Sequence, residues 1–208
     1  RFLIATIILY IIVKHKDTNI YRLKAADIPV FLITGFVGMF CYHVLFFTAI
    51  KYTTAINSSI IGATNPIITT ILCIIFLKDK LTPKRLVGIM LSFTGVLLTI
   101  TNANIEVLRK FSFNKGDLLM LVAVIMWAAY AVYSKRIMPR YSPMIVTFYS
   151  FLFCTMILVP FVLYEAPWKN FGSVPPSAYA AVVYMSIFPS VIGYLVQQMS
   201  IKQIGPSK

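Results

Sequence analysis

Charged side chains are scarce in this sequence. They make up 12% of the 208 residues, whereas 59% of the residues are hydrophobic. A soluble domain usually has about a quarter of its residues charged, because charged groups cover the surface that faces water. Half that share cannot cover a globular surface, and here long uncharged runs alternate with short charged ones. The composition therefore excludes an ordinary soluble domain and indicates a multi-pass membrane protein.

Acidic residues and cysteines are rarer still. Six Asp and Glu stand against 19 Lys and Arg, which gives a formal net charge of +13. The cations lie in short loops between apolar runs and form no continuous stripe, so we exclude a nucleic-acid partner. Cys41, Cys73 and Cys154 all lie inside apolar runs and fit neither a disulfide nor a C-x-x-C metal site. We expect buried packing cysteines, no metal and no cofactor.

Enzyme signatures are absent from the sequence as well. It contains no H-E-x-x-H, no Walker loop and no G-x-S-x-G. We therefore predict that the chain is not an enzyme. Two alternatives to a transporter stay open, an intramembrane enzyme acting on lipid-linked substrates and a non-transporting membrane scaffold. The enzyme would need clustered His, Asp or Glu at membrane depth, where His43 stands alone.

What the sequence does have is a series of apolar segments. There are seven: Phe2–Val13, Ile28–Ile50, Ala55–Leu77, Leu86–Thr101, Leu118–Tyr133, Met144–Tyr164 and Tyr179–Ile201. Most approach the roughly 20 residues that a membrane-crossing helix needs. The first would rise only about 18 Å at 1.5 Å per residue, which is too short. We therefore expect that this sequence begins inside a span and that the true N-terminus is absent.

Lysine and arginine are unevenly divided between alternate loops. The loops after the first, third, fifth and seventh segments hold 13 of them, and the other loops hold 5. Because cytoplasmic loops carry an excess of Lys and Arg, we expect the first set to face the cytoplasm. "KDKLTPKR", residues 78–85, is then a cytoplasmic hairpin whose cations act as topological anchors. No Asp, Glu, Lys or Arg lies deep within a span, so no buried charge is visible to match an ionic ligand.

A weak sequence similarity relates the two halves of the chain. "TAIKYTTAINS" around Lys51 resembles "MSIKQIGPSK" around Lys202, at an offset of 151 residues. Five spans separate the two sites, so the loop count places Lys51 outside and Lys202 inside. A repeat with an odd number of spans must be inverted, which is a recurrent plan of secondary transporters.

Four stretches of the chain resemble a known family. They are "RFLIA", "FLKDKLTPKRLVGIMLSFTGVLLTI", "GDLLMLVAVIMWAAYAVYSKRI" and "SIKQIGPSK". In them the chain is similar to the EamA-type permeases of the drug/metabolite transporter superfamily. The resemblance implies ten transmembrane helices in two inverted five-helix repeats, with both termini in the cytoplasm. The family commonly has Glu where this chain has Asp79, so the carboxylate is kept but shortened.

By that template the seven segments match spans two to eight. Residues 1–104 then belong to the first repeat and residues 116–208 to the second. We expect about 30 further residues before Arg1 and roughly 80 after Lys208, at about 20 per span plus loops. The predicted fold is an all-α integral membrane protein with seven visible transmembrane helices of a ten-helix inverted-repeat (5+5) transporter.

Polar and aromatic residues inside the spans give the candidate site. Pro66 frees backbone groups that must be satisfied by protein or by water in a cavity, and Asn65 offers an amide beside them. Helix packing through these polar and aromatic faces is the alternative to a cavity, and the sequence leaves both open. The predicted cavity lining is Tyr42, His43, Phe46, Ser58, Asn65, Trp127, Tyr130, Tyr194 and Gln197.

The predicted function follows from the resemblance together with this lining. We expect a secondary transporter, a permease or exporter, that moves a small organic metabolite such as an amino acid or aromatic compound by alternating access. Its partners would be that solute and the lipid bilayer of the plasma membrane, which we take to be the bacterial inner membrane. Gly88, Ser92 and Gly95 form a small face that suggests close helix packing or a homodimer.

Overall fold

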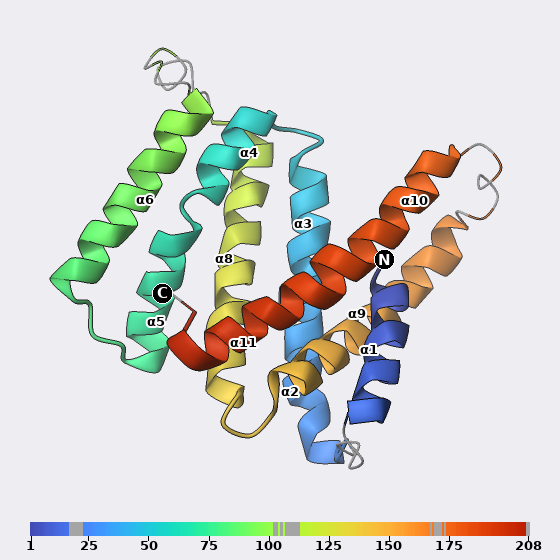
Figure 1. Cartoon of the computed structure of the whole chain (residues 1–208). Helices are drawn as coiled ribbons and strands as arrows, with labels where there is room; N and C mark the ends of the chain where they lie inside the picture. The colour runs from blue at the N-terminus through green and yellow to red at the C-terminus, as the bar shows by residue number, and fades with distance from the viewer. Residues whose placement is uncertain are drawn as a thin grey trace. The chain divides into compact units, whose positions relative to one another are not determined.

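Helices and connecting turns build the whole described chain, and the residues described contain no strand. The computed structural model describes residues 1–16, 23–101, 104, 106, 113–166, 168, 172 and 174–206. Seven helical stretches follow one another (Figure 1): α1 (Phe2–Lys16); η1 (Ala25–Asp27), α2 (Ile28–Ile33), η2 (Thr34–Cys41) and α3 (Tyr42–Ala49); α4 (Ala55–Gly62) and α5 (Asn65–Leu77); α6 (Pro83–Thr101); α8 (Lys115–Ile137); α9 (Pro143–Glu165); and α10 (Pro176–Met185), η4 (Ser186–Gly193) and α11 (Tyr194–Ile204). Each predicted apolar segment lies on one of these stretches.

Six stretches within the described residues are long and apolar enough to cross a membrane, and Phe2–His15 is a shorter apolar helix. The prediction of an all-α multi-pass membrane protein is confirmed. Five cations used in the orientation count lie outside the described residues: Arg22, Arg109, Lys110, Lys169 and Lys208. The orientation and the ten-helix inverted repeat stay predictions.

Contacts between helices divide the chain into two compact units. Unit 1 comprises Arg1–Phe40 and Ile137–Ile204, and unit 2 comprises Cys41–Arg136 and Gly205–Lys208. Each unit draws on both halves of the sequence, so the units are a different division from the predicted repeats at 1–104 and 116–208. Those repeat boundaries stay a prediction.

Unit 1 is packed around α9. Helices α1, α2 and α11 all contact α9, and α1 also contacts η4. Close approach is possible at Gly35, where an added Cβ would lie 2.9 Å from the Ser150 carbonyl oxygen of α9. Next to it, the Ser150 hydroxyl donates to Thr34 Oγ1 at 2.8 Å. Small and hydroxyl side chains thus let two apolar helices meet backbone to backbone.

A fully buried carboxylate fixes the start of the second span in unit 1. Asp27 is 0% exposed and accepts hydrogen bonds from Arg140 Nη2 at 2.9 Å and the Tyr141 hydroxyl at 2.6 Å. Its other oxygen accepts from the Lys24 backbone N–H at 3.2 Å. Burial of a carboxylate is costly unless donors surround it, and here they do.

Unit 2 has its core where α3, α4 and α8 meet. Ala49, Ile61, Met120 and Val124 are buried together there. Above this core Asp117, which is 0% exposed, accepts hydrogen bonds from the Thr53 hydroxyl, the Asn57 side-chain amide and the Asn114 backbone N–H. These bonds tie the start of α8 to the loop and helix that follow α3.

Two spans contain a π-helical stretch of eight residues at matching positions. One is η2 (Thr34–Cys41) and the other is η4 (Ser186–Gly193), and they lie 152 residues apart along the chain. This offset agrees within one residue with the offset of 151 residues between the similar stretches around Lys51 and Lys202. π-Helical turns are rare and frequent at functional sites.

Candidate functional site

The third span is interrupted at the Asn-Pro pair. Helix α4 ends at Gly62, and α5 begins at Asn65 with Pro66 in its first turn, so the ribbon bends between them (Figure 1). Proline lacks an N–H and clashes with the preceding turn, which makes the start of a helix its natural place. Because Pro66 has no N–H, the Gly62 carbonyl loses its helical donor, and within α5 the Thr70 hydroxyl donates to the Pro66 carbonyl at 2.8 Å. The interruption predicted from the sequence is confirmed.

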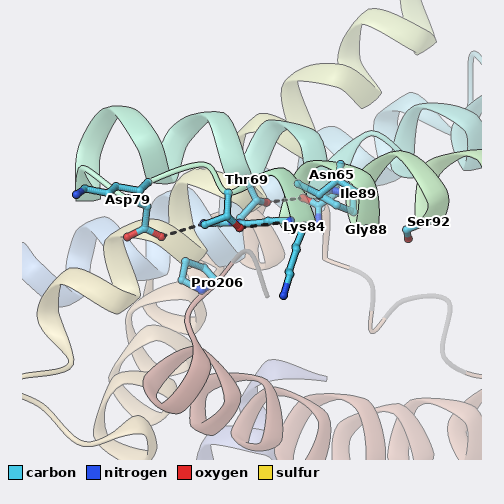
Figure 2. Close-up of a pocket in the computed structure, with 12 residues that line it drawn as sticks. Asn65, Thr69, Asp79, Lys84, Gly88, Ile89, Ser92 and Pro206 are labelled. Carbon is cyan, nitrogen blue, oxygen red and sulfur yellow. Dashed lines mark hydrogen bonds and ion pairs between the residues drawn. The ribbon is translucent and has the colours of Figure 1, made fainter.

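A pocket of about 850 Å³ lies beside this interruption, within unit 2. Figure 2 shows Asn65, Thr69, Asp79 and Lys84 among the side chains that surround it. Its lining comes from α5, α6, the loop between them and the C-terminal turn: Asn65, Pro66, Thr69, Asp79, Lys80, Thr82, Lys84, Arg85, Gly88, Ile89, Ser92 and Pro206. The wall combines apolar surface with polar groups and carries more cations than anions.

Arg85 is the charged group of this pocket that the sequence did not reveal. Its side chain is only 11% exposed, whereas its ion-pair partner Asp79 is 40% exposed, with 3.5 Å between Nη1 and Oδ2. The Nε and Nη2 atoms of Arg85 are buried and have no hydrogen-bond partner among the described residues. The sequence predicts only a topological anchor at Arg85, and the structure adds that its side chain is largely buried.

Helix geometry explains why Arg85 turns inward. Thr82 caps the start of α6, accepting a hydrogen bond from the Arg85 backbone N–H at 3.4 Å. Arg85, Gly88 and Ser92 are spaced i, i+3 and i+7, so they share one face of α6. The two small residues leave room for the arginine, and an added Cβ on Gly88 would meet nothing within 4 Å. That spacing is the signal in the sequence that could have found this site.

The aromatic residues of the predicted lining form a cluster of their own in unit 2. Trp127 on α8 lies against Tyr42 on α3, with ring centroids 4.8 Å apart, and against Tyr130 at 5.7 Å. Tyr42 also contacts His43 at 4.8 Å and Phe46 at 5.9 Å. Tyr130 is 1% exposed, and the other four rings are half-buried. The fold thus brings together five residues that the sequence proposed separately.

The other predicted residues are placed as follows. Asn65 lines the pocket, and the hydroxyl oxygen of Ser58 is buried without a hydrogen-bond partner in the described part of the chain. Tyr194 and Gln197 lie on α11 in unit 1, where the Tyr194 ring meets Phe151 at 5.1 Å. A single cavity lined by all nine residues stays a prediction.

A family model decides the identity of the chain. The model of the EamA-like transporter family matches residues 1–101 and again 114–208. The chain belongs to the EamA-like transporter family. This confirms the resemblance seen in the sequence and, with the six apolar helices, makes the chain a multi-pass membrane protein of a transporter family.

Relatives of this EamA-like chain have also been described. It is 32% identical, over 206 residues, to the uncharacterized transporter YyaM of Bacillus subtilis, covering 99% of this chain and 67% of that protein. It is 24% identical to a probable terminal-alkyne amino-acid exporter of Streptantibioticus cattleyicolor, over 85% of this chain and 57% of the exporter. The chain spans about half to two thirds of the length of the curated relatives it matches.

A solved crystal structure has the same fold. It superposes with a TM-score of 0.75 over 97% of this EamA-like chain and 67% of the other, at 21% sequence identity. At that sequence identity the similarity supports only the shared helical fold.

Proposed function

We propose that the chain is a secondary transporter that moves a small organic metabolite across the bacterial inner membrane by alternating access. The observation that carries the proposal is the span broken at Asn65-Pro66 beside a polar pocket. Discontinuous helices form the solute sites of many secondary transporters, because their freed backbone groups bind the solute or the coupling ion. Family membership supports the same reading.

The substrate class we propose is an amino acid or an aromatic compound. The cluster of Tyr42, Trp127 and Tyr130 offers flat apolar surface of the kind that aromatic side chains provide in binding sites. One relative is named a probable terminal-alkyne amino-acid exporter, which is consistent with this class.

The repeat architecture belongs to the same proposal. We take residues 1–104 and 116–208 as parts of two inverted five-helix repeats, which the matching offset of η2 and η4 supports. A homodimer through Gly88, Ser92 and Gly95 stays a prediction, and the mass of the protein in nanodiscs tests it.

Flux through proteoliposomes tests the proposed transport. The protein is reconstituted, and uptake of a ¹⁴C-labelled amino-acid mixture is measured together with the melting temperature. We expect Trp127→Ala to reduce uptake about fivefold or more at a subsaturating solute concentration, because lost aromatic contact weakens binding by about 1–3 kcal/mol. Trp168→Ala is the matched control, since Trp168 is 48% exposed, and it should leave uptake unchanged.

A second variant separates transport from folding. Asn65→Leu should reduce uptake more than it lowers the melting temperature, because we expect the amide to be hydrated or bound to solute. If Trp127→Ala and Asn65→Leu both lower the melting temperature while uptake stays normal, these residues only pack helices and the cavity is refuted. No uptake of any amino acid by the wild-type protein refutes amino acids as the substrate class.

A further inference from the structure

We propose that the pocket beside Asn65 is an oxyanion site, in which Arg85 binds the carboxylate or phosphate-type group of a small organic solute. The inference rests on the proposed function only in taking a solute as the ligand. The sequence predicts only topological anchors in the cations of "KDKLTPKR", and nothing in the family assignment gives this pocket a ligand.

One edge of the Arg85 guanidinium is engaged, and the adjacent edge is unpaired but buried, so the side chain must rotate for that edge to meet a ligand in the pocket. Nη1 contacts Asp79 at 3.5 Å, which is the outer limit of a hydrogen bond. Nε and Nη2, which form the adjacent edge, are buried and have no partner in the described chain. Two parallel N–H donors on one edge match the two oxygens of a carboxylate or phosphate. A buried charge with unsatisfied donors is costly, and a bound oxyanion would remove that cost.

The surroundings of Arg85 favour an anion. Lys80 and Lys84 also line the pocket, and Asp79 is the acidic residue among the lining side chains. Arg85 and Lys84 lie in the first turn of α6, which begins at Pro83. Cations there oppose the positive end of the helix dipole, so the protein alone gains nothing from them. An oxyanion in the pocket would be attracted both by these cations and by the positive end of the helix.

The pocket also has room and polarity for the rest of a small solute. Its volume is about 850 Å³, within the range of about 300–1,000 Å³ that small-molecule sites occupy. Asn65, Thr69 and Ser92 supply an amide and hydroxyls along the wall, and Ile89 an apolar contact. The arginine stem has several rotatable bonds, so a modest rotation turns its open edge toward the ligand.

Melting temperature with matched probes tests the site, using the full chain in nanodiscs of phosphatidylcholine. The probes are phenylacetate, benzylphosphonate, phenylacetamide and phenethylamine, which share a benzyl group and differ in the charge of the head group. A ligand that binds only the folded state raises stability by mass action. We expect a rise of about 3 °C or more at saturation with either acid and no rise with the amide or the amine.

Two conservative substitutions locate the effect. Arg85→Lys keeps the charge but loses the planar fork, so the apparent affinity for phenylacetate should fall about tenfold or more. Arg136→Lys is the matched control, because Arg136 is exposed and lies outside the pocket lining, and it should bind as the wild type does. Asp79→Glu is informative too, because a longer carboxylate reaches the open edge and competes with the probe, lowering the affinity.

The outcomes separate the possible sources of the anion. Equal stabilisation by phenylacetate and phenylacetamide, or unchanged acid binding in Arg85→Lys, overturns the proposal. Stabilisation by phosphatidylglycerol in the nanodisc with no response to either soluble acid assigns the site to lipid and overturns the solute. Because binding is measured without transport, a failure of amino-acid uptake leaves this result standing, and failure of acid binding leaves the uptake experiment intact.

Discussion

Two Asp–Arg pairs among the described residues are built in opposite ways. In unit 1 the carboxylate of Asp27 is completely buried while the side chain of Arg140 is 61% exposed, and the two meet at 2.9 Å. In unit 2 the arginine is the buried partner, with Arg85 at 11% and Asp79 at 40% exposed, and the distance is 3.5 Å. The same two residue types therefore produce two different electrostatic situations.

The two pairs differ in whether the buried charged group has all its hydrogen-bond partners within the described chain. Asp27 accepts from three donors, Arg140, Tyr141 and the Lys24 N–H, so its buried charge is satisfied within the protein. Arg85 makes one long contact and leaves two buried nitrogens without a partner in the described chain. The Asp27 pair stabilises the ends of the helices that it joins. In our proposal, the unpaired nitrogens of Arg85 lower the stability of the free protein and are available to bind a ligand.

Removing the buried carboxylate should have the largest effect. Asp27→Ala leaves the Tyr141 hydroxyl and the Lys24 N–H without their acceptor, and we expect the free energy of unfolding to fall by about 3–5 kcal/mol. Thermal unfolding in detergent measures it. Glu165→Ala is the control, because Glu165 is an exposed carboxylate at the end of α9, and it should change stability by less than about 0.5 kcal/mol. Equal effects of the two substitutions would remove the distinction drawn here.

Replacing arginine with methionine should change the stability of the protein differently in the two pairs. Arg140→Met takes a charged donor from buried Asp27 and should lower stability by about 1.5–3 kcal/mol. Arg85→Met replaces an unsatisfied buried cation with an apolar side chain of similar length, so stability without ligand should stay unchanged or rise by about 1 kcal/mol. Melting curves of the two variants, recorded side by side, measure the contrast. A loss at Arg85 as large as that at Arg140 means that Arg85 is already satisfied.

Two glycines sharpen the contrast between packed and open surfaces. Gly35→Ala forces a methyl group to within 2.9 Å of the Ser150 carbonyl and should lower stability by about 1–3 kcal/mol. Gly88→Ala lies on the pocket face with nothing within 4 Å, so it should be neutral or stabilise the helix by up to about 1 kcal/mol. Equal melting temperatures in the two variants would show that the α6 face is as tightly packed as η2 against α9.

The features that could be predicted from the sequence are local ones. Apolar runs located the seven helical stretches of the described chain, six of which are long enough to span a membrane. Asn65-Pro66 located the break in the third span, because proline constrains its own backbone. Partners distant in sequence could not be predicted in the same way. Asp27 and Arg140 are 113 residues apart, and only the packing of α2 on α9 brings them together.

The direction in which a side chain points is the second feature that could not be predicted from the sequence. The turn between the third and fourth spans was located, but Arg85, assigned to that turn, lies in the first turn of α6. The charge count does not distinguish a cation that faces water from one that turns along its helix. Similarly, Tyr42 and Trp127 each fitted either packing or a cavity wall, and their mutual contact depends on how α3 meets α8. Both questions are decided by tertiary packing, which periodicity does not encode.

The most direct test of the central claim, that Arg85 offers an open guanidinium edge to a solute acid, is NMR of arginine side chains. The sequence has six arginines, so the Nε–H signal of Arg85 can be assigned by its loss in Arg85→Lys. Saturating phenylacetate should move this proton downfield, as expected for a charge-assisted hydrogen bond to a carboxylate, while phenylacetamide should leave it in place. An Arg85 signal that stays unmoved by phenylacetate, or that moves equally with the amide, would contradict the account.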